Sequence, residues 1–252
     1  MSEDQIDWDE GRVLRFFPTD MSDQEMHTEF VGADAAWRSG APVAAVYGIE
    51  MAKGRVGVIE DRVDGPTMLH TLSSAPWQAK RRGQELAELH LRLTSLAAAG
   101  ELPDIKLHLL HALKQADLDF SARAKLIAQL ESLPSGDRLL HTALHPSHVV
   151  LHATGPVITH CGHMARGHAD ADIAFTLVHL ALAVPLPNAR LWPLLDRARR
   201  RFLAAYQHTI SRGRPSDRAT DWVAVIAAAR LAAATDHEVV ILRRLIDGAP
   251  VR

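Results

Sequence analysis

The chain has 252 residues, with 28 Lys and Arg against 30 Asp and Glu, which gives a formal net charge of −2. A composition of 47% hydrophobic and 23% charged residues is typical of a folded globular domain and excludes a disordered chain. The balanced charge does not favour a nucleic-acid partner, and no apolar run approaches the roughly 20 residues that span a bilayer. Cys161 is the only cysteine and the N-terminus is acidic, so we expect no disulfide, no secretion signal, no membrane partner and a cytoplasmic location.

The first 64 residues predict a small α+β unit with a mostly antiparallel sheet. Strands are predicted from the short apolar runs Val13–Phe17, Val43–Ile49 and Arg55–Val63. Between the first two runs, Ser22 and Glu25 have the spacing of a capping box, which predicts a helix that ends near Gly40.

The turn sequence Asp64-Gly65-Pro66-Thr67 predicts a boundary between a domain of residues 1–64 and one of residues 65–252. Helices are predicted over Trp77–Leu96, Ile105–Leu113, Arg123–Leu133, Asp172–Val184, Ala189–Arg212, Ser216–Ala234 and Asp236–Ile246. The segment 139–168 interrupts them with two β-like runs, Val149–His152 and Pro156–Thr159, which predict a hairpin. A polar hairpin inside a helical domain is where we expect a functional site.

The segment Leu139–Leu151 reads LLHTALHPSHVVL and resembles the catalytic loop HGDLHPxNVL of aminoglycoside phosphotransferases and choline-kinase-like enzymes. Arg166–Ala174 resembles that family's RGDPxxDLA segment, Leu86–His90 its LAxLH helix, and Gly65-Pro66-Thr67 its interlobe segment. The resemblance implies an α+β, two-lobed protein-kinase-like fold. Its N-terminal lobe (1–64) would be truncated, and its mainly helical C-terminal lobe (65–252) would hold the relic catalytic hairpin (139–168).

The same resemblance implies which residues line the cleft between the lobes. Arg15 lies where the family's phosphate-contacting basic residue is expected, and Glu29 where its helical partner is expected. The candidates for a ligand-binding cleft are Arg15, Glu29, Glu60, His141, His145 and Asp172. His141, His145 and Asp172, with His90, match residues that hold the family's catalytic loop in shape.

The residues that would carry out phosphoryl transfer are replaced. Transfer needs a carboxylate that accepts the nucleophile's proton and oxygen ligands that hold Mg²⁺. Ala143 stands at the position of the proton acceptor, and His148 and His160 stand at the positions of the two metal ligands. Imidazole is a poor ligand for magnesium. Only twelve residues precede Val13, too few for two strands and a glycine-rich loop over a nucleotide.

We therefore expect a pseudokinase, in which no cofactor is required and neither ATP nor Mg²⁺ is used. It would bind a protein, a peptide or a small molecule in the interlobe cleft, in a biosynthetic or resistance pathway, as a homodimer or within a hetero-complex. The identity of the ligand is open at this stage.

Two alternatives remain from the sequence. Seven of the 15 histidines lie between residues 141 and 168, so a repurposed enzyme could use imidazoles as acid and base, or bind Zn²⁺ or another transition metal. The candidate metal ligands are His148, His160, His145, His163 and Cys161. No HExxH or paired CxxC motif supports them, and uncharged or solvent-facing imidazoles are the favoured explanation of the cluster. The second alternative is an active phosphotransferase that uses Asp170 or Asp172 as a displaced acid.

Overall fold

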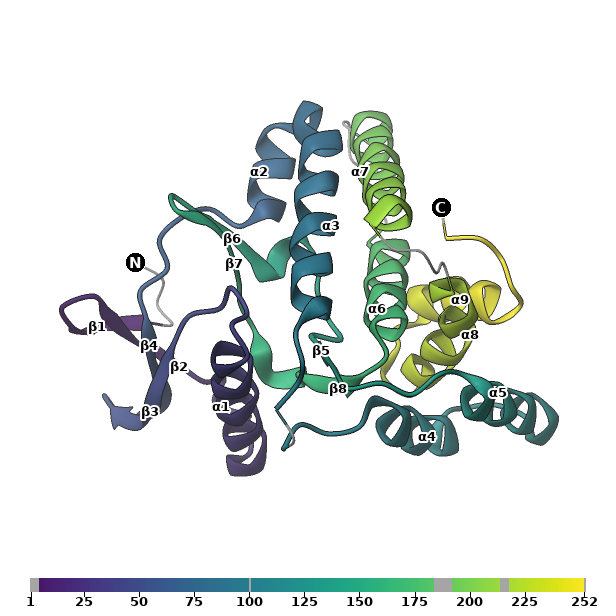
Figure 1. Ribbon diagram of the computed structural model, residues 1–252, viewed down its shortest axis with the longest axis horizontal. Coiled ribbons are helices and arrows are strands. Elements are labelled where there is room, and N and C mark those ends of the chain that lie inside the picture. The colour runs from purple at the N-terminus through teal and green to yellow at the C-terminus, as the bar shows by residue number, and fades with distance from the viewer. Residues whose placement is uncertain (1–4, 100, 184–191, 214–217, 252) are drawn as a thin grey trace.

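The computed structural model describes residues 5–99, 101–183, 192–213 and 218–251. Its N-terminal part is an antiparallel sheet with the strand order β1-β2-β4-β3, next to helix α1 (Figure 1). The elements are β1 (Gln5–Asp9), β2 (Arg12–Phe16), α1 (Asp23–Arg38), β3 (Val46–Ala52) and β4 (Arg55–Asp61).

Helix α1 begins as its sequence predicts. The Ser22 side chain accepts a hydrogen bond from the backbone N–H of Glu25, and the Glu25 carboxylate accepts one from the backbone N–H of Ser22. Gly40, with φ of +81°, follows the end of the helix in the left-handed region that glycine adopts at low cost. Local sequence therefore determined both ends of this helix.

Strand β1 is a correction to the sequence analysis. The described residues before Arg12 include the strand β1, which pairs with β2 through a turn at Gly11, where φ is +85°. The sequence QIDWD is polar and its residues are half-buried or exposed, so an apolar pattern could not reveal it.

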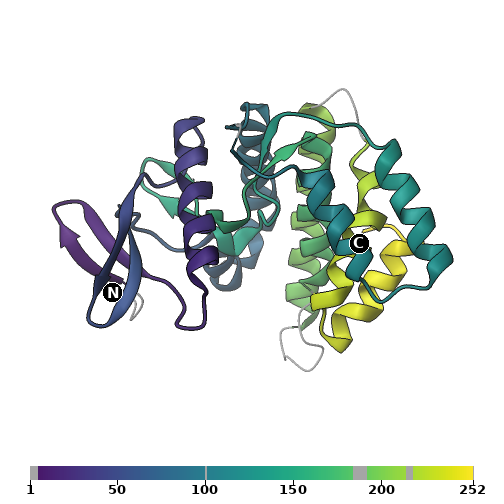
Figure 2. The same ribbon diagram turned by 90° about the horizontal axis from the view of Figure 1, so that it is seen from below.

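The C-terminal part is helical, and α3 and α7 pack against each other along their length (Figures 1 and 2). The helices are α2 (Met68–Ser74), α3 (Ala79–Ser95), α4 (Ile105–Gln115), α5 (Phe120–Ser132), α6 (Ala169–Leu182), α7 (Trp192–Gly213), α8 (Ala219–Ala229) and α9 (Asp236–Ile246). Helix α2 was not predicted, and α6 begins three residues before its predicted start. Residues 184, 189–191 and 216–217 of the predicted helices lie outside the described residues.

Two short antiparallel ladders connect the sheet to the helices. Strand β5 (Arg138–Leu140) pairs with β8 (Ala165–Gly167), and β6 (Val149–His152) pairs with β7 (Gly155–Ile158) as the predicted hairpin. Isolated bridges join the hairpin to residues before α2, Val43 to Ile158 and Thr67 to Val150. The predicted relic hairpin therefore lies between the N-terminal sheet and the helical part.

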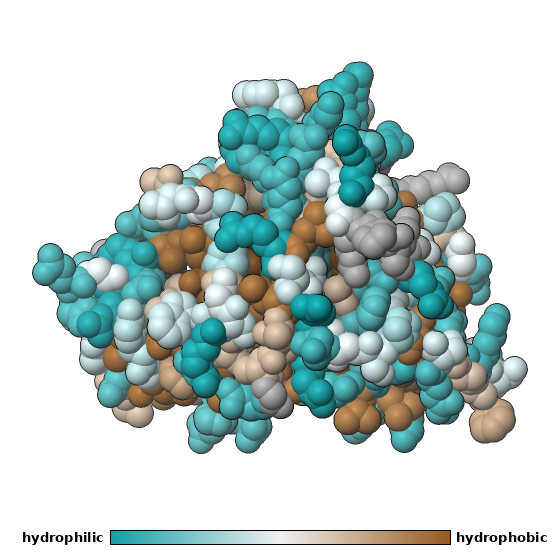
Figure 3. Space-filling view, in the orientation of Figure 1, coloured by the Kyte–Doolittle hydropathy of each residue, from teal (hydrophilic) through white to brown (hydrophobic). Residues whose placement is uncertain are grey.

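The hydrophobic core is continuous across the predicted boundary at residue 64. Ala33, Ala35 and Ala36 of α1 belong to the same buried cluster as the C-terminal helices, and a smaller cluster of Leu14, Phe16 and Ile59 lies within the sheet. The division into domains 1–64 and 65–252 stays a prediction. Within the described ranges, no helix combines the length and apolar character needed to cross a membrane. Figure 3 shows polar and apolar residues interspersed over one face.

Gly32 allows α1 to approach the segment η3 (Cys161–His163) closely. A Cβ at Gly32 would lie nearer to the carbonyl oxygen of Cys161 than real Cβ atoms come to a neighbour. We expect Gly32→Ala to lower the free energy of unfolding by about 1–3 kcal/mol, because the helix must move away from a backbone atom. Urea denaturation measures this loss. Gly48→Ala is the control, since a Cβ there meets no atom within 4 Å; equal effects of the two substitutions would contradict the prediction.

Candidate functional site

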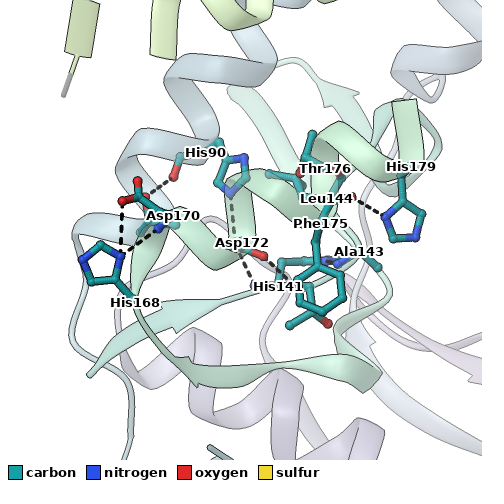
Figure 4. A network of polar contacts seen from close by, with 12 residues as sticks. His90, His141, Ala143, Leu144, His168, Asp170, Asp172, Phe175, Thr176 and His179 are labelled. Atoms are coloured by element: carbon teal, nitrogen blue, oxygen red, sulfur yellow. Dashed lines mark hydrogen bonds and ion pairs between the residues drawn. The ribbon is translucent and has the colours of Figure 1, made fainter. Parts of the chain in front are cut away.

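Asp172, near the start of α6, holds the loop that contains Ala143. Its side chain is fully buried and accepts hydrogen bonds from the backbone N–H groups of His141, at 3.0 Å, and of Thr142, at 2.6 Å (Figure 4). His90 of α3 donates to the same carboxylate from Nε2 at 3.0 Å. Burial by itself would raise the pKa of Asp172, but His90 and the N–H of His141 lower it. The carboxylate therefore stays ionised and positions the loop.

His141 extends this network towards the hairpin. Its Nε2 donates to the carbonyl oxygen of Thr159 at 3.0 Å, and its Nδ1 accepts from the backbone N–H of Ala143 at 3.3 Å. This pattern requires the neutral ring, because a second ring proton would face an N–H group. Burial lowers the pKa of His141 to about 4. His90, His141 and Asp172 thus hold the loop in shape, as the resemblance implies.

The position that the resemblance assigns to the proton acceptor holds only a methyl group. Ala143 is buried, and its carbonyl oxygen accepts a hydrogen bond from Nδ1 of His148 at 2.9 Å. Asp172 is engaged by the three donors described above. Asp170 is 1% exposed, and its carboxylate lies 3.4 Å from Nδ1 of His168 (Figure 4). Both acids proposed as displaced catalytic groups are therefore buried in polar contacts of their own.

Four imidazole rings form a row beside Ala143, which we call the histidine row: His179, His145, His148 and His160. The ring centroids are 5.4 Å apart for His179 and His145, 3.9 Å for His145 and His148, and 4.5 Å for the stacked rings of His148 and His160. Burial and neighbouring rings lower the pKa of His148 to about 3 and that of His145 to about 4. At neutral pH these rings are uncharged.

The geometry around the predicted metal ligands does not bring them together, and the metal site stays a prediction. Among the described residues, no three His, Cys, Asp or Glu side chains are grouped so that they could hold a metal ion. His148 and His160 stack face to face, which does not direct their nitrogen atoms at a shared point. Burial raises the pKa of the Cys161 thiol to about 12, so the free thiol is protonated at neutral pH. The His163 side chain is exposed.

Arg15, Glu29 and Glu60 come together between the sheet and α1. Arg15 on β2 lies 2.8 Å from Glu29 of α1 and 3.0 Å from Glu60 of β4. Burial alone would lower the pKa of Arg15, but the two carboxylates raise it above its ordinary value. Two carboxylates and one guanidinium leave a formal charge of −1 at the position where a phosphate-contacting cation is expected. Arg15 and Glu60 line a cavity of about 170 Å³ together with His160 and Cys161.

A second, larger pocket has three members of the histidine row in its wall. Its volume is about 580 Å³, and Ala143, His145 and His148 form part of its wall. Two further lining residues, His179 and Arg230, were missed by the sequence analysis. His179 lies two helical turns after Asp172, on the same face of α6, which is a signal that could have found it. Nothing in the sequence around Arg230 indicates this site.

Comparison with known proteins places this geometry in a structural class. No protein-family model and no curated protein matches the chain. Among solved structures, the amicoumacin kinase hAmiN in complex with AMP-PNP, Ca²⁺ and Ami is similar, with a TM-score of 0.60, 12% identity, and coverage of 95% of this chain and 83% of that one. An aminoglycoside-3'-phosphotransferase of type VIII has a TM-score of 0.57 and 16% identity over 94% of this chain and 84% of that one. Choline kinase from Cryptosporidium parvum Iowa II has a TM-score of 0.53 and 11% identity over 94% and 81%.

The similarity covers both the sheet and the helices, and the chain therefore has the two-lobed protein-kinase-like fold. More particularly, this is the form of that fold found in aminoglycoside phosphotransferases and choline kinase, as the sequence resemblance implies.

Proposed function

We propose that this protein is a pseudokinase of the aminoglycoside phosphotransferase type, without ATP- and Mg²⁺-dependent phosphoryl transfer. It binds a partner protein, a peptide or a small molecule in the cleft between its lobes, in a biosynthetic or resistance pathway. The observation that carries the proposal is the buried methyl group of Ala143 in a loop that Asp172 and His141 still hold in place. A carboxylate is needed there to accept the proton of the nucleophile.

The surroundings of Ala143 support the same function. His148 donates its Nδ1 proton to a carbonyl and stacks on His160, so neither position offers the oxygen ligands that Mg²⁺ prefers. Arg15 is already paired with two carboxylates, which would repel a triphosphate. The cavity beside it, about 170 Å³, is smaller than the roughly 300–1,000 Å³ of ordinary ligand pockets.

Thermal unfolding in the presence of nucleotide tests the proposal. We expect the Tm in millimolar ATP with Mg²⁺ to equal the Tm in EDTA, because a ligand that does not bind the folded state cannot stabilise it. An active aminoglycoside phosphotransferase, treated in the same way, is the positive control. A Mg²⁺-dependent rise in Tm, or transfer of labelled phosphate to any acceptor, would show that the protein is a working kinase.

One observation favours the alternative of a repurposed enzyme. Because the carbonyl oxygen of Ala143 can only accept, Nδ1 of His148 carries the proton and Nε2 keeps a lone pair that can act as a base. A pKa of about 3 makes that base weak at neutral pH, which ranks this function second. Elemental analysis of the purified protein tests its metal-dependent form: stoichiometric zinc that is lost in His148→Ala would favour it.

A further inference from the structure

The pocket of about 580 Å³ has few charged residues in its walls. Its walls come from the loop around Ala143, from η3 and β8, and from the helices α4, α6 and α8. Among the described residues that line it there is no Asp or Glu, and Arg230 is the only one of them with a permanent charge. A cationic ligand would therefore meet no carboxylate among these lining residues, and the charged group nearest to it would be the guanidinium of Arg230.

Much of the wall is apolar. Ile105 and Leu109 of α4, Phe175 and Val178 of α6, and Ile226 of α8 line the pocket. Its volume is within the range of roughly 300–1,000 Å³ that holds drug-sized molecules. An apolar body of that size would be removed from water in this pocket, which favours the complex.

The polar groups of the wall are arranged to recognise a second part of a ligand. The Nδ1 atoms of His148 and His179 donate to the carbonyl oxygens of Ala143, at 2.9 Å, and of Phe175, at 2.8 Å. Both rings are half-buried, so their neutral forms are favoured and each Nε2 is an acceptor. These atoms suit a ligand that carries hydroxyl or N–H donors.

Arg230 provides the complementary donor. One of its terminal nitrogens lies 3.3 Å from the Glu238 carboxylate, and the side chain is 37% exposed. A guanidinium has five N–H donors in a planar fork, and Glu238 takes only one of them. The N–H donors of the two terminal nitrogens that Glu238 leaves unused can bind the oxygens of a carboxylate, whereas the buried Nε cannot reach one.

Resting on the proposed function, we infer that this pocket binds a largely apolar carboxylic acid, with its acid group on Arg230 and its body against the walls of α4, α6 and α8. A polycationic amino sugar is the wrong ligand for it. The inference names the ligand class of the cleft, and it assigns to Arg230 the role of selecting an anion over a cation.

Isothermal titration with two naphthalene probes of similar shape tests the inference at pH 7.5. We expect 2-naphthylacetate to bind at least about tenfold more tightly than 2-naphthylethylammonium, which corresponds to about 1.4 kcal/mol. Kanamycin, a polycation, is expected not to bind. In Arg230→Gln the preference for the anion is expected to disappear, because the guanidinium that distinguishes the two probes is gone.

A pair of neighbouring variants locates the binding. Ala233 lines the pocket and Ala232, also exposed, does not. We expect Ala233→Trp to abolish binding of 2-naphthylacetate and Ala232→Trp to leave it unchanged. Tighter binding of the cation, or equal effects of the two variants, would overturn the inference. Its failure is separable from failure of the proposed function, because loss of probe binding leaves the absence of ATP turnover intact, whereas phosphate transfer refutes the pseudokinase whatever the probes do.

Discussion

Asp172→Ala is expected to lower the free energy of unfolding by about 3–5 kcal/mol, the range measured when one partner of a buried charge-assisted network is removed. The substitution leaves the N–H groups of His141 and Thr142 and the Nε2 of His90 without their shared acceptor. A buried donor without a partner costs about 1–3 kcal/mol. Urea denaturation followed by circular dichroism measures the loss.

Two further substitutions make this measurement specific. Asp172→Asn retains one acceptor oxygen but presents an NH₂ group to the other donors, so its effect is expected to lie between those of wild type and Asp172→Ala. Asp117→Ala is the control, because the Asp117 side chain is 96% exposed and lies 3.6 Å from Arg243; its effect is expected to stay within about 0.5 kcal/mol. If Asp172→Ala were as mild as this control, the loop would be held by other contacts.

The second large effect is a loss of stability in mild acid. The pKa of His141 is about 4 in the folded state, and an unfolded chain has the ordinary histidine value of about 6.5. The folded state therefore favours the neutral ring. The stabilisation this provides is complete above pH 6.5 and is lost as the pH falls towards 4. The loss amounts to about 2 kcal/mol at pH 5 and about 3 kcal/mol at pH 4.

Urea denaturation at pH 7 and pH 5 measures this dependence in a window above the range in which most carboxylates titrate. The half-buried rings of His145 and His148 have lowered pKa values and add to the slope in the same direction. His141→Gln can still donate to the carbonyl oxygen of Thr159 and cannot be protonated, so its stability is expected to change less between the two pH values. A wild-type protein equally stable at pH 7 and pH 5 would contradict the assignment of a neutral, buried His141.

The helices were predicted well where local signals are strong. The capping box at Ser22 gave α1 its start, and a second capping box at Thr235 starts α9 over the predicted range Asp236–Ile246. The strand β1 was not predicted from the sequence, because it is a polar edge strand. Its pairing with β2 is seen only in the tertiary structure. A periodic pattern of apolar residues arises where one face of an element is buried. An element that buries few side chains therefore shows little of this pattern in its sequence.

In the candidate site, too, some features could be predicted from the sequence and others could not. Its loop residues could be predicted because they follow one another in the motif from His141 to His148. The pairing of Arg15 with two carboxylates could not be predicted from a local motif, because Glu29 and Glu60 come from a helix and a strand that are distant in sequence. The metal-ligand expectation stays a prediction: the spacing of histidines along the chain does not determine ring orientation, and in this geometry the rings of His148 and His160 stack.

The sequence alone predicted a two-lobed kinase-like fold through its resemblance to aminoglycoside phosphotransferases, and it placed Ala143 at the position that the resemblance assigns to a proton acceptor, since residue identity and motif order are properties of the chain itself. Only the tertiary structure decided that Arg15 is shared by two acids, that the imidazoles stack, and that His179 and Arg230 complete a pocket without carboxylates. These features depend on the distances between side chains from different elements. Such distances follow from the packing of the elements against one another, which no local sequence pattern determines.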